Sequence, residues 1–186
     1  MTFVLSPHAE IMNAGEIKLP AGEYDQVQYV SAQFLKGKTP KAWKGFPDEG
    51  SNWANLPPEE RKRLAEQLRS AMMNGKVMSL WMSFDPWGED CFLSADFENG
   101  RAALLYNACD ECAAAPCDPD RPDGGEDARV DIGGQTPVPK MCAVEDMAKA
   151  AEILLYFLEN GKLSPETRWA VCRGEYVGLP WDEIGG

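Results

Sequence analysis

The sequence is poor in the groups that most enzymes use for catalysis. Its 186 residues include a single histidine, His8, which lies in an N-terminal segment without clear periodicity. A serine or cysteine nucleophile usually needs a neighbouring base, so such a centre would have to use this histidine. No glycine-rich phosphate-binding motif occurs, and the paired glycines at 124–125 and 133–134 have no helix after them. We therefore expect a protein that is not an enzyme and has no cofactor. A small hydrolase that uses the plentiful carboxylates is the weaker alternative.

Long apolar runs are also absent from the chain. No stretch of about 18 uninterrupted apolar residues is present that could span a bilayer as a helix. The first ten residues lack the basic region and the apolar stretch of a secretory signal. Hydrophobic residues make up 44% of the chain and charged residues 26%, which is typical of a globular protein. We expect a cytoplasmic protein that contacts no membrane.

Positive charge is scarce in the C-terminal part of the chain. The whole sequence has 18 Lys and Arg against 30 Asp and Glu, a net charge of −12. Residues 1–76 are nearly neutral at +1, whereas residues 77–186 have a net charge of −13. Such a field repels nucleic-acid phosphates and attracts basic proteins. The basic, aromatic segment at 36–46 is therefore interpreted as a solvated loop in preference to a nucleic-acid-binding arm.

The hydrophobic pattern predicts an α+β fold, in which an antiparallel sheet of four to five strands packs against two to three helices. Apolar residues spaced by three or four positions predict helices at 24–35, 58–74 and 144–160, each followed within two residues by a glycine. We interpret residues 1–75 as an N-terminal helical region packed on the same core, and residues 76–186 as an α+β domain.

Alternation of apolar and polar residues predicts the strands. Three of them follow one another in antiparallel order, and Glu98-Asn99-Gly100 supplies a tight hairpin turn between the second and the third. The expected strands span residues 77–84, 91–97, 101–106, 129–132 and 168–172. In the first strand Val77, Ser79, Trp81 and Ser83 share one side, and Met78, Leu80, Met82 and Phe84 occupy the other.

Residues 108–128 have neither periodicity nor a β-branched residue, and we interpret them as an acidic, cysteine-rich loop. Seven carboxylates fall within 18 residues and only Arg121 lies among them, so a solvated and strongly negative segment is expected. These carboxylates are expected to contact a partner: Asp110, Glu111, Asp118, Asp120, Asp123, Glu126 and Asp127. A disordered insertion that contacts nothing is the alternative.

Six cysteines raise the question of a metal site. Cys109 and Cys112 have the Cys-x-x-Cys spacing with which two thiolates bind one tetrahedral ion, and Cys117 follows closely. Because a closed zinc site needs a second pair and none is evident, we expect no metal, with these three as weak candidates. A disulfide within the loop and reduced thiols both stay open. Cys91 and Cys172 are expected to be core residues.

Short motifs between Leu80 and Val171 follow one another in a recognisable order. They are the paired segments Phe92-Leu93-Ser94 and Leu104-Leu105-Tyr106, the Val138-Pro139 step, the helix Val144–Asn160 with Ala150, Ala151 and Phe157, and then Gly161, Pro165 and Trp169. This order resembles immunity proteins of bacterial polymorphic toxin systems, specifically the family that commonly accompanies secreted deaminase toxins. Residues 1–75, the spacing between Gly161 and Pro165, and the cysteine-rich segment depart from the family pattern.

The resemblance implies a cytoplasmic protein that binds a cognate toxin and neutralises it by occluding its active site. A toxin that acts on nucleic acid, such as a deaminase, presents a basic surface, which an acidic protein complements. Exposed aromatic side chains contribute most per residue at interfaces, so Trp87, beyond the first strand, is the expected anchor. The alternative is an adaptor or chaperone for a basic secreted protein.

Overall fold

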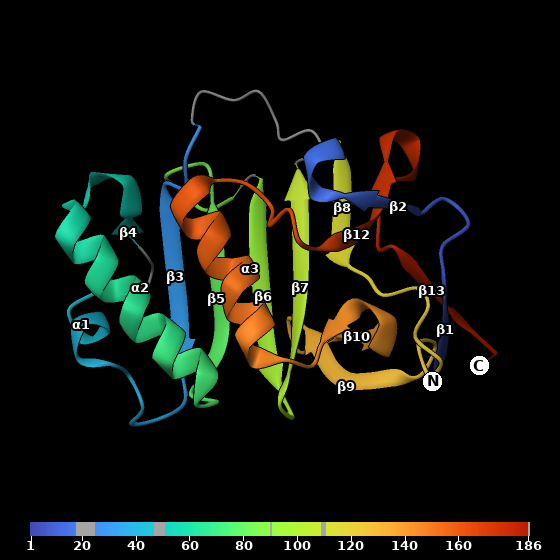
Figure 1. Ribbon diagram of the computed structural model, residues 1–186, viewed down its shortest axis with the longest axis horizontal. Helices are drawn as coiled ribbons and strands as arrows, with labels where there is room; N and C mark the ends of the chain where they lie inside the picture. The colour runs from blue at the N-terminus through green and yellow to red at the C-terminus, as the bar shows by residue number, and fades with distance from the viewer. Residues whose placement is uncertain (18–24, 47–50, 90, 109–110, 186) are drawn as a thin grey trace.

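The computed structural model describes residues 1–186 except 18–24, 47–50, 90, 109–110 and 186. It has an α+β fold, in which two long helices lie side by side across one face of a large antiparallel sheet (Figure 1). Two small sheets, each of two antiparallel strands, pack at the other end of the molecule, near the two chain termini. Within the described ranges, no helix is long and apolar enough to cross a membrane.

The main sheet has nine strands, which is more than the four to five expected. Eight of them follow one another in the order β2-β12-β8-β7-β6-β5-β3-β4, and the short β11 pairs with β7 as well. All neighbours are antiparallel. The strands are β2 (Glu10–Asn13), β3 (Tyr29–Phe34), β4 (Ser51–Asn52), β5 (Val77–Ser83), β6 (Phe92–Glu98), β7 (Arg101–Ala108), β8 (Cys112–Pro116), β11 (Ala143–Val144) and β12 (Arg168–Arg173).

The centre of the sheet forms as its sequence pattern predicts. Strands β5, β6 and β7 pair in order, with Leu80 opposite Ala95 and Ala95 opposite Leu104. The turn between β6 and β7 places Asn99 and Gly100 at φ values of 54° and 72°, the left-handed conformation that a two-residue hairpin requires. The sequence predicts these strands well because the turn residues and the alternation of apolar and polar residues indicate the same strand boundaries.

Two of the three expected helices are present, as α2 (Pro58–Met73) and α3 (Met147–Asn160). The third α-helix among the described residues is the short α1 (Lys41–Lys44). The side chain of Asp146 accepts the Ala148 N–H at the start of α3, and Gly161 ends this helix at a φ of 64°. The apolar faces of α2 and α3 bury a first core against β3, β5, β6 and β7.

Two predictions of local structure are wrong. The segment expected to be a helix at 24–35 contains β3, because pairing with β5 along its whole length outweighs a weak helical period. The expected acidic loop contains β8, which is buried between β7 and β12. The alanines of β8 give no alternation of polarity, because both of their faces are covered. Residues 1–75 are thus not a purely helical region.

A second core lies on the opposite side of the sheet. Alternate residues of β7, β8 and β12, namely Ala103, Ala115 and Ala170, face away from the first core. Two small sheets cover them, formed by β9 (Asp127–Ile132) with β10 (Thr136–Pro139) and by β1 (Thr2–Leu5) with β13 (Trp181–Ile184). This cover does not extend over β3 and β5, so half of the sheet has only two layers.

Adjacent leucines in α3 provide a test of the first core. Leu154 is fully buried, whereas Leu155 is half-buried at a groove. We expect Leu154→Ala to lower the free energy of unfolding by about 3 kcal/mol, because it removes apolar contacts and leaves a cavity. Leu155→Ala should cost about 1 kcal/mol. Urea unfolding at constant pH measures both values, and equal losses would contradict this packing.

Candidate protein-binding face

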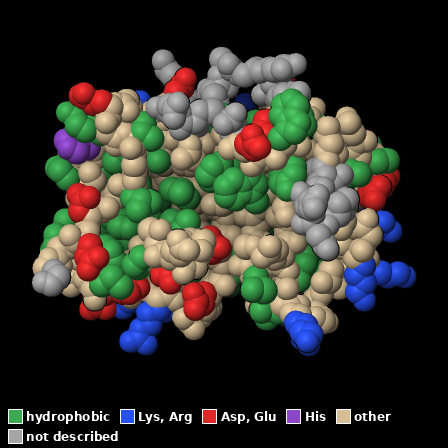
Figure 2. Space-filling model, turned by 180° about the vertical axis from the view of Figure 1, so that it is seen from behind, with side chains coloured by type: hydrophobic (Ala, Val, Ile, Leu, Met, Phe, Trp, Pro, Cys, Tyr) green, Lys and Arg blue, Asp and Glu red, His purple; other side chains and the backbone are tan. Residues whose placement is uncertain are grey.

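The uncovered half of the sheet presents a continuous set of side chains, which we call the open face. It consists of the residues of β3, β5, β6 and β7 that point away from the two helices: Tyr29, Ser31, Ser79, Trp81, Phe92, Asp96 and Leu105. Seen from behind, hydrophobic side chains gather over the middle of the molecule and acidic ones lie around them (Figure 2). Most Lys and Arg side chains in this view lie along the lower and right-hand margins.

An aromatic pair forms the centre of the open face. The rings of Trp81 and Phe92, on neighbouring strands, stack with centroids 3.8 Å apart and an interplanar angle of 25°. The Trp81 indole N–H also donates to the carbonyl oxygen of Gly88 at 2.9 Å. Both rings are half-buried, so each is partly accessible to a partner. Their fixed position lowers the entropy lost when a partner packs on them.

The connection between β5 and β6 holds Trp87 out into solvent. The Asp85 carboxylate accepts the N–H groups of Trp87 and Glu89 at 3.0 and 3.1 Å. Gly88 is required in this turn, because its φ is 75° and a Cβ would lie 2.8 Å from the ring of Tyr29. The Trp87 side chain is 73% exposed, the most exposed of the large hydrophobic residues described. The predicted anchor is therefore accessible and attached to an ordered turn beside the open face.

A carboxylate lies on the open face, at Asp96. This side chain is half-buried, and one of its oxygens accepts the N–H of Gly133 at 3.2 Å, from the turn between β9 and β10. Burial raises the pKa of Asp96, and the hydrogen bond from Gly133 lowers it by a smaller amount. A carboxylate that has already lost part of its hydration gains more from pairing with a partner's cation than a solvated one does.

Most of the predicted acidic residues are paired within the fold. Asp110 is outside the described residues, and Glu111, Asp118 and Asp120 are exposed. Arg168 lies 3.6 Å from the carboxylates of both Asp118 and Asp120. No hydrogen bond or ion pair among the described residues joins this segment to Trp87. Polar contacts therefore do not hold Trp87 and this segment to one another.

A ladder of ion pairs fixes the rest of this acidic segment. Arg121 pairs with Asp123 at 2.5 Å and with Glu145 at 2.9 Å, and Lys140 pairs with Asp123 at 3.0 Å and Glu126 at 2.7 Å. The pairing with Arg121 holds the pKa of Asp123 well below its usual range, with a smaller effect from Lys140. The segment is therefore less negative than its composition suggests, because Lys140 and Arg168 come from distant parts of the chain.

Asp127, the last of the predicted acidic residues, has a structural role. It is half-buried at the start of β9, where its carboxylate accepts the N–H of Arg129 at 2.7 Å. Arg129 has a φ of 58°, so this hydrogen bond supports an unfavourable backbone conformation. The carboxylate of Asp127 therefore stabilises the backbone of its own strand, β9.

The cysteines do not converge on a metal site in the described part of the chain. Cys112 belongs to the first core and Cys117 to the second, on opposite faces of β8, so one ion could not bind both. No group of three potential metal ligands occurs among the described residues, and Cys109 lies outside them. Cys91 and Cys172 are buried as expected, but Cys91 is also disulfide-bonded. Its partner is none of the other four described cysteines, which are all free.

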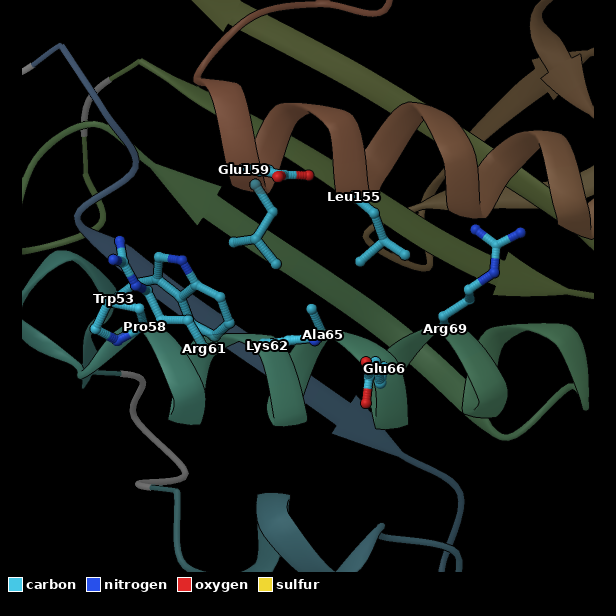
Figure 3. Close-up of a pocket in the computed structure, with 10 residues that line it drawn as sticks. Trp53, Pro58, Arg61, Lys62, Ala65, Glu66, Arg69, Leu155 and Glu159 are labelled. Atoms are coloured by element: carbon cyan, nitrogen blue, oxygen red, sulfur yellow. The ribbon is translucent and has the colours of Figure 1, made fainter.

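A cavity lies on the helical face, between α2 and α3. It has a volume of about 610 Å³, with Leu155 pointing toward α2 and Arg69 toward α3 (Figure 3). Its rim has charges of both signs, from Arg61, Arg69 and Glu159 among others. None of its lining residues is a serine, cysteine or histidine. The groove therefore has no serine or cysteine nucleophile among these residues, and its mixed charge favours no particular ligand.

The raised pKa of Asp96 predicts a pH dependence of stability. Unfolding releases this carboxyl group to its ordinary pKa, so the contribution of Asp96 to the free energy of unfolding falls as pH rises above about 4. Asp96→Asn cannot ionise, and its stability relative to the wild type should therefore increase between pH 3 and pH 7. Urea unfolding of both proteins at three pH values measures the difference. A difference that stays constant or decreases with pH would contradict the burial of this charge.

Comparison with known proteins identified no relative of this chain. No family model, no curated protein and no solved structure matches the chain. The resemblance to toxin-system immunity proteins therefore rests on the short motifs between Leu80 and Val171 alone, and the geometry of the open face is the main guide to function.

Proposed function

We propose that this protein is a cytoplasmic immunity protein that binds a cognate bacterial toxin through the open face and Trp87. The observation that most favours a binding role is an uncovered half of a large sheet, with a fixed aromatic pair at its centre and an exposed tryptophan beside it. Flat aromatic surfaces of this kind supply the buried anchors of protein interfaces. The toxin would be one that acts on nucleic acid, such as a deaminase, and the bound immunity protein would occlude its active site.

Charge supports a basic partner. The region that supplies β5 to β13 has a net charge of −13, and acidic side chains lie among the hydrophobic ones on this side of the molecule (Figure 2). A toxin that binds nucleic acid has a basic substrate surface, which this field attracts and to which it can bind in competition with phosphates. Asp96 would receive one cation of the toxin at the centre of the interface.

An adaptor or chaperone for a basic secreted protein would use the same surface. The two functions differ in what the complex does: an immunity protein abolishes the partner's activity, whereas a chaperone releases an active partner. Co-expression of this protein with the product of a neighbouring toxin gene tests the proposal directly. Rescue of growth and a stoichiometric complex on gel filtration support immunity. Full toxin activity in the presence of excess protein contradicts it.

Replacement of the exposed tryptophan tests the anchor. Trp87→Ala should weaken toxin binding by about 2 kcal/mol, roughly thirtyfold in Kd, because it removes a large apolar contact at the interface. Met73→Ala is the matched control, since Met73 is also an exposed hydrophobic residue but lies at the end of α2. Isothermal titration calorimetry gives both affinities. Equal affinities for the two variants would contradict the assignment of Trp87 to the interface.

Neutralising the exposed acids tests electrostatic steering. We expect the triple variant Glu111→Gln, Asp118→Asn and Asp120→Asn to slow association several-fold at low salt, with little change in dissociation. The control replaces Glu59, Glu152 and Glu159 of the helical face with glutamine, which changes the net charge equally. Stopped-flow kinetics at two salt concentrations measure association. An equal effect in both variants would assign the steering to net charge alone.

A further inference from the structure

Two free cysteines that are 25 positions apart in the chain lie side by side in the second core. The peptide unit that joins Cys117 to Asp118 donates a hydrogen bond of 2.7 Å to the unit that joins Met141 to Cys142. On its other side, the Cys117 N–H donates to the carbonyl oxygen of Arg168 at 3.0 Å. Backbones paired in this way hold facing Cα atoms about 5 Å apart, within the range of about 4.4–6.8 Å that a disulfide spans.

The two side chains also meet. Both thiols are free and belong to the same hydrophobic cluster, and each shifts the pKa of the other through a side-chain hydrogen bond. Cys142 is completely buried, whereas Cys117 is 7% exposed. The pair therefore consists of one sulfur near the surface and one behind it.

A small cleft gives access to Cys117 alone. It has a volume of about 310 Å³, and Cys117 lines it while Cys142 does not. Arg121, Lys140, Lys149 and Arg168 are the basic residues of this cleft, and Asp118, Glu145, Asp146 and Glu166 are the acidic ones. A small polar molecule can thus reach Cys117 without displacing any part of the core.

The surroundings of the two sulfurs distinguish their roles. The hydrogen bond from Cys142 lowers the pKa of Cys117 by more than burial and the charge of Asp118 raise it, and the charge of Arg168 adds a smaller lowering effect. The same hydrogen bond, together with burial, raises the pKa of Cys142 well above its usual range. Because the thiolate is the reactive form of cysteine, Cys117 is the nucleophile of the pair and Cys142 the resolving thiol.

We propose that Cys117 and Cys142 form a redox-active dithiol that a hydroperoxide entering the cleft oxidises to a disulfide. This site is separate from the open face and does not depend on the function proposed above. No assigned role in that function uses either sulfur, and neither Cys112 nor Cys172 has a comparable partner among the described residues.

The oxidation proceeds in two balanced steps. The Cys117 thiolate attacks one oxygen of hydrogen peroxide, the O–O bond breaks, and the departing hydroxide takes a proton to leave as water. The product is a sulfenic acid at Cys117. Cys142 then loses its proton and attacks this sulfur, the S–O bond breaks, and the hydroxyl group leaves with that proton as a second water. Two thiols lose two electrons in total, and one peroxide gains them.

The disulfide would join the end of β8 to the turn at Lys140–Cys142. It would thereby close the loop of residues 118–141, which includes the ion-paired Asp123, Glu126 and Lys140. Closing this loop restricts the unfolded chain, so oxidation should raise the melting temperature by several degrees.

Mass spectrometry of the full chain tests the proposal. After addition of stoichiometric hydrogen peroxide, we expect the intact mass to fall by two hydrogen atoms and tandem spectra to show a peptide linked through Cys117 and Cys142. In Cys142→Ser, dimedone should trap a sulfenic acid at Cys117. Cys117→Ser should react with peroxide at least tenfold more slowly than the wild type. Cys172→Ser, which alters another buried thiol, should behave as the wild type does.

Each opposite result overturns the proposal. Unmodified thiols, a linkage through other cysteines, or equal peroxide rates for Cys117→Ser and the wild type would all do so. Because serine at a buried position can destabilise the fold, alkylation of the wild-type protein provides a second measurement. Iodoacetamide should modify Cys117 first, and at a lower pH than it modifies Cys112; the reverse order would also refute the assignment. Toxin binding is not part of either measurement, so failure here leaves the proposed function untouched.

Discussion

The pleat of the central strands separates the molecule into two environments on which the rest of the structure depends. Side chains of β5, β6 and β7 alternate between the helical core and the opposite face, so that Leu80 is buried while its neighbour Trp81 meets solvent. Under α2 and α3 the inward set is uniformly apolar. On the other side, the two small sheets cover β8, β12 and parts of β6 and β7. The open face exists because this second cover stops short of β3 and β5.

The sequence predicts what depends on local pattern and fails where distant contacts decide. The strands β5, β6 and β7 and the helices α2 and α3 have clear periods and turn or cap residues, and their predictions are confirmed. The strand β8 consists of small residues buried on both faces, which leaves no alternation to detect. Part of the open face could be predicted from the sequence, because Trp81 shares its side of the strand with two serines. The partly buried environment of Asp96 could not be predicted, because the turn that contacts this residue is 37 residues away in the sequence.

Charge in this protein is of two kinds with different roles. The ladder through Arg121, Asp123 and Lys140 is paired within the fold, and it joins the acidic segment to the start of α3 by way of Glu145. These carboxylates already have cations, so they add little to the attraction of a partner at short range. Asp96 and the exposed Glu111 have no such cation among the described residues. A count of acidic residues therefore overestimates the attraction of the paired segment for a basic partner, and it underestimates the attraction of the open face.

The paired acids and the two thiols belong to one structural unit, which explains how oxidation could act beyond its own site. Cys117 precedes Asp118, and Cys142 ends the same turn whose Lys140 binds Asp123 and Glu126. Main-chain hydrogen bonds from Asp118, Lys140 and Met141 hold the unit together when the thiols are reduced. Because these bonds already fix the geometry, a disulfide would restrain the segment without moving it. The acidic segment would then keep its shape in both redox states and differ only in how readily it opens.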